Sequence, residues 1–160
     1  MKPKPIVGIV LLVFAAGSLA YLVVSEVLSR DDSPLPATRV APQAPADGVV
    51  VTYFLTNVRC PTCLKIEAYT KEAVETGFAD TLTEARIVWR VINTDEPANK
   101  HFIDDYQLFA KAVVVSVRRG GSEVKWKNLE AIWDLVGDKD EFLAYIRTEV
   151  AAALNEAKGM

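Results

Sequence analysis

The sequence predicts one mixed α/β domain with the element order β-α-β-α-β-β-α and helices on both faces of its sheet. Three continuous runs of apolar and β-branched residues, at 49–56, 86–93 and 112–117, have the length and composition of buried strands. A helical segment separates the first two runs, which implies that they pair in parallel through a right-handed crossover. A glycine-containing turn at 118–122 follows the third run and predicts a hairpin into a fourth strand at 123–127.

Two helices are expected between the strands. Apolar residues recur at helical spacing from Cys63 until Gly77, where the pattern stops. A short second helix from Pro97 to Tyr106 carries proline in its first turn, where the missing N–H has no partner to lose.

The C-terminal part is also expected to be helical. Asn128 can cap the segment LEAIWDLV, and Gly137 can close it. Asp138 and Glu141 then form a capping-box pattern before FLAYIRTEVAAALNEA. The sequence leaves open whether these two segments are one kinked helix or two.

The N-terminal part predicts a membrane anchor. Residues 6–24 are uncharged and almost wholly apolar, and as a helix they would span about 28 Å, close to the thickness of the hydrocarbon core of a bilayer. Lys2 and Lys4 precede this run and acids follow it, which favours a cytoplasmic N-terminus. A cleaved signal peptide, cut near 18–20, is the alternative. We therefore expect a single-pass protein of the bacterial inner membrane with four parts: cytoplasmic residues 1–5, a transmembrane signal anchor at 6–25, a proline-rich linker at 26–47 and a periplasmic domain at 48–160.

The charge of the exported part argues against nucleic acid as a partner. All 21 acidic residues follow the anchor, whereas two of the 18 basic residues precede it, so the exported part carries a formal charge of −5. No basic cluster is long enough to follow a phosphate backbone. The oxidising compartment also permits a disulfide.

The two cysteines of the chain, Cys60 and Cys63, stand two residues apart at the start of the first helix. At a helix N-terminus, unpaired backbone amides favour an anion, and Arg59 adds a positive charge, so both lower the expected pKa of the Cys60 thiol. Pro61 is well tolerated in a first helical turn, and Thr62 follows it between the two cysteines as a supporting residue. Cys60 is thus expected to attack a partner's sulfur, and the more buried Cys63 to close the disulfide and release the partner.

A binding role for the same thiols is the alternative. Two soft thiolates could hold a thiophilic ion such as arsenite or Cu(I). A tetrahedral zinc site needs four ligands, whereas the chain offers two cysteines and one histidine, His101, which is expected at the surface. Metal binding therefore stays open as a hypothesis that involves Cys60 and Cys63 alone.

A buried strand, a short loop and Cys60–Pro61–Thr62–Cys63 opening a helix resemble the thioredoxin fold, over about residues 48–152. The resemblance implies a thiol–disulfide oxidoreductase or electron-transfer protein. It implies no cofactor beyond a redox-active disulfide, and a protein thiol or disulfide as its partner. Thioredoxin-like proteins place a cis-proline before the third strand, where this chain has Ala112, so the Lys111–Ala112 peptide is expected to be trans.

Three further positions bear on this resemblance. The buried acid that many thioredoxins carry on the first strand is replaced by Phe54, and the tryptophan before the first cysteine is replaced by Arg59. Lys111 lies beside the expected site, where it could hold Cys60 as a thiolate or meet an anionic partner, or simply remain a solvated lysine.

A narrower resemblance rests on the anchored architecture, the CPTC motif and the segment WKNLEAIWDLVGDKDEFLAYI. These are similar to membrane-anchored thioredoxin-like proteins named nitrophenyl-compound nitroreductase subunits, from bacterial organoarsenical resistance clusters. That resemblance implies a transmembrane thiol-electron conduit as partner. The chain lacks a glycine-rich dinucleotide fingerprint, so it would deliver electrons through Cys60 and Cys63 to chemistry located elsewhere.

Overall fold

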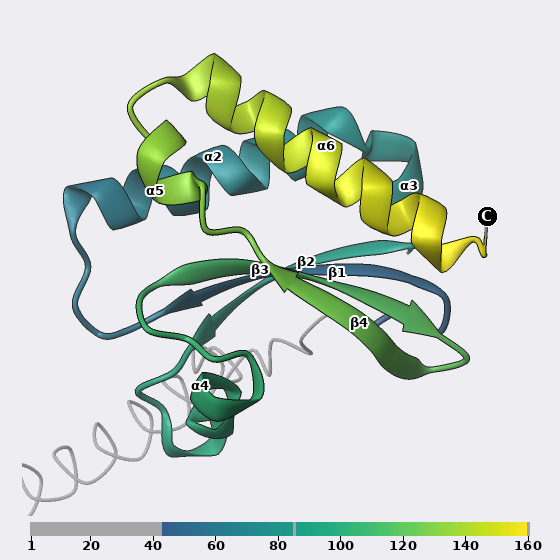
Figure 1. The fold of residues 1–160 in the computed structure, drawn as a ribbon, viewed down its shortest axis with the longest axis horizontal. Helices are drawn as coiled ribbons and strands as arrows, with labels where there is room; N and C mark the ends of the chain where they lie inside the picture. The colour runs from purple at the N-terminus through teal and green to yellow at the C-terminus, as the bar shows by residue number, and fades with distance from the viewer. Residues whose placement is uncertain (1–42, 85, 160) are drawn as a thin grey trace, which may run out of the picture. The chain divides into compact units, whose positions relative to one another are not determined.

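The computed structural model describes residues 43–84 and 86–159, so the predicted anchor and most of the predicted linker lie outside the described residues. In the part that is described, no helix combines the length and apolar character needed to cross a membrane. The elements, shown in Figure 1, are β1 (Gly48–Leu55), α2 (Pro61–Gly77), α3 (Ala79–Thr83), β2 (Ile87–Asn93), a 3-10 turn η1 (Pro97–Asn99), α4 (His101–Asp105), β3 (Ala112–Arg119), β4 (Ser122–Asn128), α5 (Ile132–Leu135) and α6 (Lys139–Ala157).

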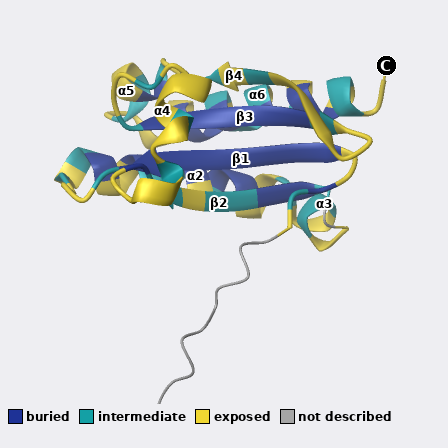
Figure 2. Ribbon diagram, turned by 90° about the horizontal axis from the view of Figure 1, so that it is seen from below, coloured by how far each residue is buried: buried dark blue, intermediate teal, exposed yellow. Residues whose placement is uncertain are grey.

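The four strands form one mixed sheet in the order β2-β1-β3-β4. β1 pairs in parallel with β2, and β3 pairs antiparallel with β4, as the sequence predicted. β1 also pairs antiparallel with β3, which joins these two units into one sheet. Gly120 and Gly121 form the hairpin turn with φ of 57° and 81°, a conformation that glycine adopts without steric cost. β1 and β3 are the central strands, and Figure 2 shows them buried along most of their length.

Helices cover both faces of the sheet, also as predicted. α2 and α6 lie on one face and α4 lies on the other (Figure 1). Alternation along β1 sends Val51, Tyr53 and Leu55 into the larger core under α2 and α6. The intervening Phe54 packs on the opposite face in a small cluster with Tyr106 and Val114.

The C-terminal segments correct part of the prediction. Asn128 is not a helix cap, because it is the last residue of β4 and pairs with Val114 in the sheet ladder. Of the segment LEAIWDLV only Ile132–Leu135 is helical, and α6 is a separate helix, which settles the question of one helix or two. The Asp138 carboxylate accepts a hydrogen bond from the Glu141 N–H at 3.1 Å, which confirms the predicted N-cap of α6.

The first helix begins at Pro61 with Cys60 as its N-cap, as expected. Two smaller differences concern the other helices. The segment from Pro97 to Tyr106 divides into η1 and α4. The short helix α3, with no buried residue, was not predicted because it carries no apolar stripe for periodicity to detect.

Candidate functional site

The loop between β1 and α2 is held by side chains from the end of β2. The Asn57 N–H donates to an Asp95 carboxylate oxygen at 2.7 Å, and the Asn93 side-chain amide donates to the Asn57 side-chain oxygen at 2.8 Å. β1 and β2 run in parallel and end at the same edge of the sheet, so these residues meet there. These two hydrogen bonds hold Asn57 in place, at the start of the loop that leads to Cys60.

Cys60 and Cys63 form a disulfide at the N-terminus of α2, with their Cα atoms 5.0 Å apart. Cys60 has an extended backbone and is the N-cap residue, and its Sγ accepts a hydrogen bond from the Cys63 N–H at 3.0 Å. Pro61 occupies the first helical turn, as expected, and Thr62 is half-buried beside it. Cys60 remains partly exposed, whereas Cys63 is only 1% exposed. A partner can therefore reach the first sulfur far more easily than the second.

Tyr53 is the polar side chain of β1 that lies beneath the cysteines. Its hydroxyl donates a hydrogen bond of 3.0 Å to the Cys63 carbonyl oxygen, in the buried interior. Burial, and then the nearby negative charge of Glu67, raise the pKa of Tyr53 to about 12. The phenol therefore stays protonated at neutral pH and acts there as a hydrogen-bond donor.

The sequence analysis missed Tyr53, although the alternation along the first strand could have identified it. The resemblance to thioredoxins instead pointed to Phe54, the next residue, as the counterpart of their buried acid. Phe54 points to the other face of the sheet, where its ring lies 5.4 Å from that of Phe102 and 5.3 Å from that of Tyr106. No described residue of β1 presents a carboxylate to the disulfide, because the strand contains none.

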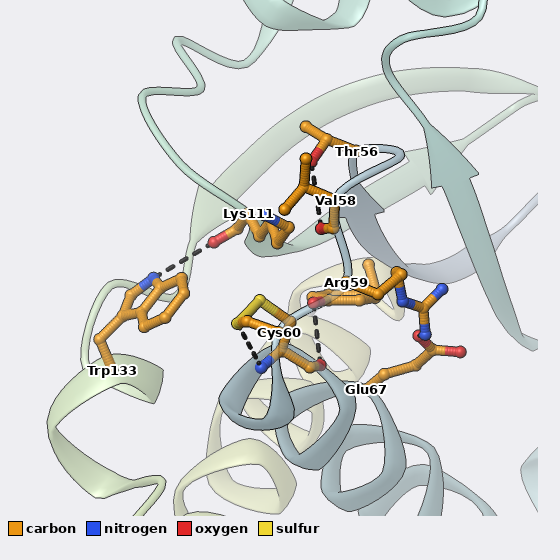
Figure 3. Close-up of a disulfide and its surroundings, with 9 residues drawn as sticks. Thr56, Val58, Arg59, Cys60, Glu67, Lys111 and Trp133 are labelled. Atoms are coloured by element: carbon orange, nitrogen blue, oxygen red, sulfur yellow. Dashed lines mark hydrogen bonds and ion pairs between the residues drawn. A yellow bond between two sulfur atoms is a disulfide. The ribbon is translucent and has the colours of Figure 1, made fainter.

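Arg59 is paired rather than free to act on Cys60. Its guanidinium forms an ion pair and hydrogen bond with the carboxylate of Glu67, two turns along α2. Figure 3 shows the guanidinium directed toward Glu67 and away from the sulfur atoms. The positive charge expected beside Cys60 is therefore present, but it forms an ion pair with Glu67 on α2.

Lys111 directly precedes β3, which begins at Ala112, and Figure 3 draws Lys111 among the surroundings of the disulfide. Trp133 on α5 donates its indole N–H to the Lys111 carbonyl oxygen at 3.2 Å. Ala112 is buried and lies opposite Phe54 in the ladder, and the Lys111–Ala112 peptide is trans, as expected. The indole of Trp133 thus holds the main chain just before β3, next to Ala112, the residue that stands where thioredoxin-like proteins have a cis-proline.

An open groove runs beside this loop. It has a volume of about 360 Å³, and its walls include Phe109, Lys111 and Trp133 together with the ends of β1 and β2. Phe109 is 98% exposed and Val58, two residues before Cys60, is 71% exposed. Phe109 thus exposes almost its whole apolar side chain where it lines the groove.

In the part of the chain that the structure describes, no third potential metal ligand joins the two cysteines. Among residues 43–84 and 86–159, no three side chains of histidine, cysteine, aspartate or glutamate gather closely enough to hold a metal ion. His101 lies exposed on α4, as predicted, with its Nε2 atom 3.9 Å from the Asp105 carboxylate.

No family model matches this chain, and no curated protein matches it either. Solved structures do. A thioredoxin from Thermus thermophilus is 23% identical with a TM-score of 0.42, and the match covers 72% of this chain and 82% of that one. The thioredoxin Mala s 13 from Malassezia sympodialis is 17% identical with a TM-score of 0.40, covering 71% and 84%. Thioredoxin f2 from Chlamydomonas reinhardtii is 16% identical with a TM-score of 0.37, covering 67% and 83%.

The topology of the chain itself decides the fold. A parallel β-α-β unit, an antiparallel hairpin beside it and helices on both faces reproduce the arrangement that the sequence predicted. The domain has a thioredoxin-like fold. Within that fold, the Cys60–Cys63 disulfide lies where the loop after the first strand enters α2. This is the position of the CPTC motif on which the resemblance to thioredoxins rests.

Proposed function

We propose that this chain is a thiol–disulfide oxidoreductase or electron-transfer protein whose Cys60–Cys63 pair cycles between disulfide and dithiol. The observation that carries the proposal is the disulfide at the N-terminus of α2, with one sulfur accessible and the other buried. The backbone N–H of Cys63 already contacts the Cys60 sulfur at 3.0 Å, and it would donate to a thiolate at the same place.

The reducing half-reaction uses these two positions in order. The Cys60 thiolate attacks one sulfur of a partner's disulfide, so a mixed disulfide forms and the other partner sulfur leaves as a thiolate. Cys63 then loses its proton to solvent and attacks the Cys60 sulfur, which releases the second partner thiolate and closes the Cys60–Cys63 disulfide. Two electrons pass to the partner in total, and its two thiolates take up their protons from solvent. In reverse, the same steps oxidise a partner dithiol.

A protein partner and a membrane tether belong to this proposal. The exposed side chains of Val58, Phe109 and Trp133 would cover apolar residues next to the partner's cysteine, and Lys111 would favour an acidic group there. Residues 6–25 would anchor the domain in the bacterial inner membrane, with the domain in the periplasm. The similarity to nitroreductase subunits of organoarsenical resistance clusters supports a transmembrane thiol-electron conduit as electron donor.

A redox titration of the full-length chain tests the proposal. The protein is equilibrated in glutathione buffers of increasing oxidation, and free thiols are counted by alkylation and mass. We expect one reversible two-electron transition that involves Cys60 and Cys63. In the same buffers, Cys63→Ser should accumulate a glutathione adduct at Cys60, whereas Cys60→Ser should form little adduct, because Cys63 is buried.

Two results would overturn this function. Thiols that never return to the disulfide after reduction would exclude a working couple. Stoichiometric retention of arsenite or Cu(I), lost in both serine variants and accompanied by no redox transition, would instead establish the binding role considered above.

A further inference from the structure

The Arg59–Glu67 ion pair lies beside the first two turns of α2. Glu67 follows Cys63 by four residues, so it lies one turn beyond the buried cysteine, and helical side chains lean toward the N-terminus. Its carboxylate thereby reaches back to the guanidinium of the residue before Cys60. Both side chains are partly shielded from solvent, with exposed fractions of 37% for Arg59 and 27% for Glu67.

The pair is within electrostatic reach of the disulfide. The Tyr53 hydroxyl, hydrogen-bonded to the Cys63 carbonyl, feels both members: the Glu67 charge raises the pKa of Tyr53 and the Arg59 charge lowers it. At the Tyr53 hydroxyl the two charges act in opposite directions and that of Glu67 has the larger effect, so the charge of Arg59 is offset there by its ion-pair partner. A carboxylate that engaged Arg59 less would leave a positive charge next to Cys60.

We propose that Glu67 is a positioning residue that holds Arg59 away from Cys60, and so sets the redox poise of the Cys60–Cys63 pair. This inference rests on the proposed function. In the dithiol state the Cys60 thiolate is then stabilised by the N-terminus of α2 and the Cys63 N–H, without direct help from the neighbouring guanidinium. If Glu67 is removed, Arg59 can turn to the thiolate.

The consequence for the redox equilibrium has a definite sign. The disulfide takes up two electrons and two protons to give the dithiol, and glutathione supplies both while it is oxidised. Any interaction that stabilises the Cys60 thiolate favours the reduced side and makes the pair a stronger oxidant. Glu67 therefore keeps the pair more reducing than the arginine alone would leave it.

The test compares four variants of the full-length chain with the unchanged protein: Glu67→Gln, Arg59→Gln, the double variant, and the control Glu75→Gln. Glu75 is an exposed acid further along α2 that pairs with Lys71, so it matches the charge change far from the cysteines. The first measurement is the pH dependence of alkylation of Cys60 in chemically reduced protein, which gives its pKa. The second is the equilibrium constant with glutathione at a pH above that pKa.

We expect Glu67→Gln to lower the pKa of Cys60 by roughly 0.5 to 1 unit, and to shift the glutathione equilibrium about threefold or more toward the dithiol. Arg59→Gln should move both quantities in the opposite direction, because Glu67 is then left unpaired. The double variant should return close to the unchanged protein, and Glu75→Gln should match it. Other titratable groups around the site, among them Tyr53, Lys111 and Asp95, are the same in every variant.

Opposite shifts in the single variants, cancelling in the double variant, are the pattern that a merely structural role would not give. Single variants that both leave the Cys60 pKa unchanged, or both shift it in the same direction, would overturn the inference. The alkylation measurement needs only reduced protein, so it decides this question even if the unchanged chain fails to cycle. A chain that fails to cycle would overturn the proposed function alone.

Discussion

At the scale of single residues, the site combines two cysteines that the sequence identifies with a tyrosine that it does not. Cys60 and Cys63 are identified by their spacing and by their position at the start of a helix. In the sequence, Tyr53 is one more large residue of a buried strand. Its contact with Cys63 becomes clear only when the structure shows that it lies on the same side of the sheet as α2. Its buried hydroxyl makes the protein sensitive to alkaline pH.

Replacement of Tyr53 by phenylalanine should remove part of that alkaline sensitivity. Folding raises the pKa of Tyr53 from 10.0 to about 12, so the stability from this group is complete below pH 10 and is lost as the pH rises toward 12. We expect the free energy of unfolding to fall less steeply over that range in Tyr53→Phe, with a difference of about 2 kcal/mol at its upper end. Near neutral pH the lost hydrogen bond should cost about 1 kcal/mol.

Urea unfolding at a series of pH values measures both effects. Tyr106, which donates to the Glu123 carboxylate at 2.8 Å, also has a raised pKa, so some alkaline loss should remain in the variant. An unchanged pH slope in Tyr53→Phe would show that this phenol does not hold its proton more tightly in the folded state.

The ion pair of Arg59 shows a second limit of sequence analysis at this scale. A basic residue next to a cysteine predicts a lowered thiol pKa, but its partner stands eight residues further along the chain. Only the helix, which brings Glu67 back toward its own N-terminus, reveals that the charge is shared. Side-chain rotamers and desolvation determine with which acid an exposed arginine forms an ion pair, and neither leaves a pattern in the sequence.

At the scale of elements, the strands were predicted almost to the residue, whereas α4 and α5 were predicted longer than they are and α3 was missed. Strands of seven or eight residues with continuous apolar runs carry a strong signal, as do the glycines of the hairpin. α3, α4 and α5 have four or five residues each, too few for a periodic pattern. Asn128 illustrates the ambiguity, since a residue that often caps a helix here ends a strand.

Two glycines with positive φ should differ sharply in how they tolerate alanine. Gly48 begins β1 at φ 155°, and a Cβ there would overlap the backbone carbonyl of Arg86, which accepts the hydrogen bond of 2.8 Å from Val49 N–H. Gly121 has φ 81°, with open space around its missing Cβ. We expect Gly48→Ala to cost roughly 3 kcal/mol, from the clash and the disturbed ladder, and Gly121→Ala about 1 kcal/mol, from backbone strain alone.

Urea denaturation of the two variants gives this comparison directly, with Gly121→Ala as the control for backbone strain. Equal losses in the two would mean that the start of β1 can move away from Arg86 at no cost, and that close packing does not explain the glycine there.

At the scale of the whole described domain, the sheet separates two cores of different size. The larger one lies under α2 and α6 and includes Ile146 and Phe142, both fully buried. The smaller one joins Phe54, Tyr106 and Val114 to α4. The disulfide lies at the N-terminus of α2, on the side of the larger core. The groove is lined by the end of β1, by Thr94 and Trp133, and by residues 108–111, which follow α4.

The two cores should respond differently to truncation. Ile146→Ala removes a fully buried side chain from α6 and should cost about 2–5 kcal/mol of global stability, so protection of β1 amides against hydrogen exchange should fall with it. Phe102, half-buried on α4, contacts the rings of Phe54 and Tyr106. Phe102→Ala should speed exchange of amides in α4 and in the following loop at 107–111 while β1 keeps most of its protection.

If Phe102→Ala instead reduced protection of β1 and α4 equally, the domain would open as one cooperative unit. The groove wall could then not adjust to a partner while the Cys60–Cys63 disulfide stays in place.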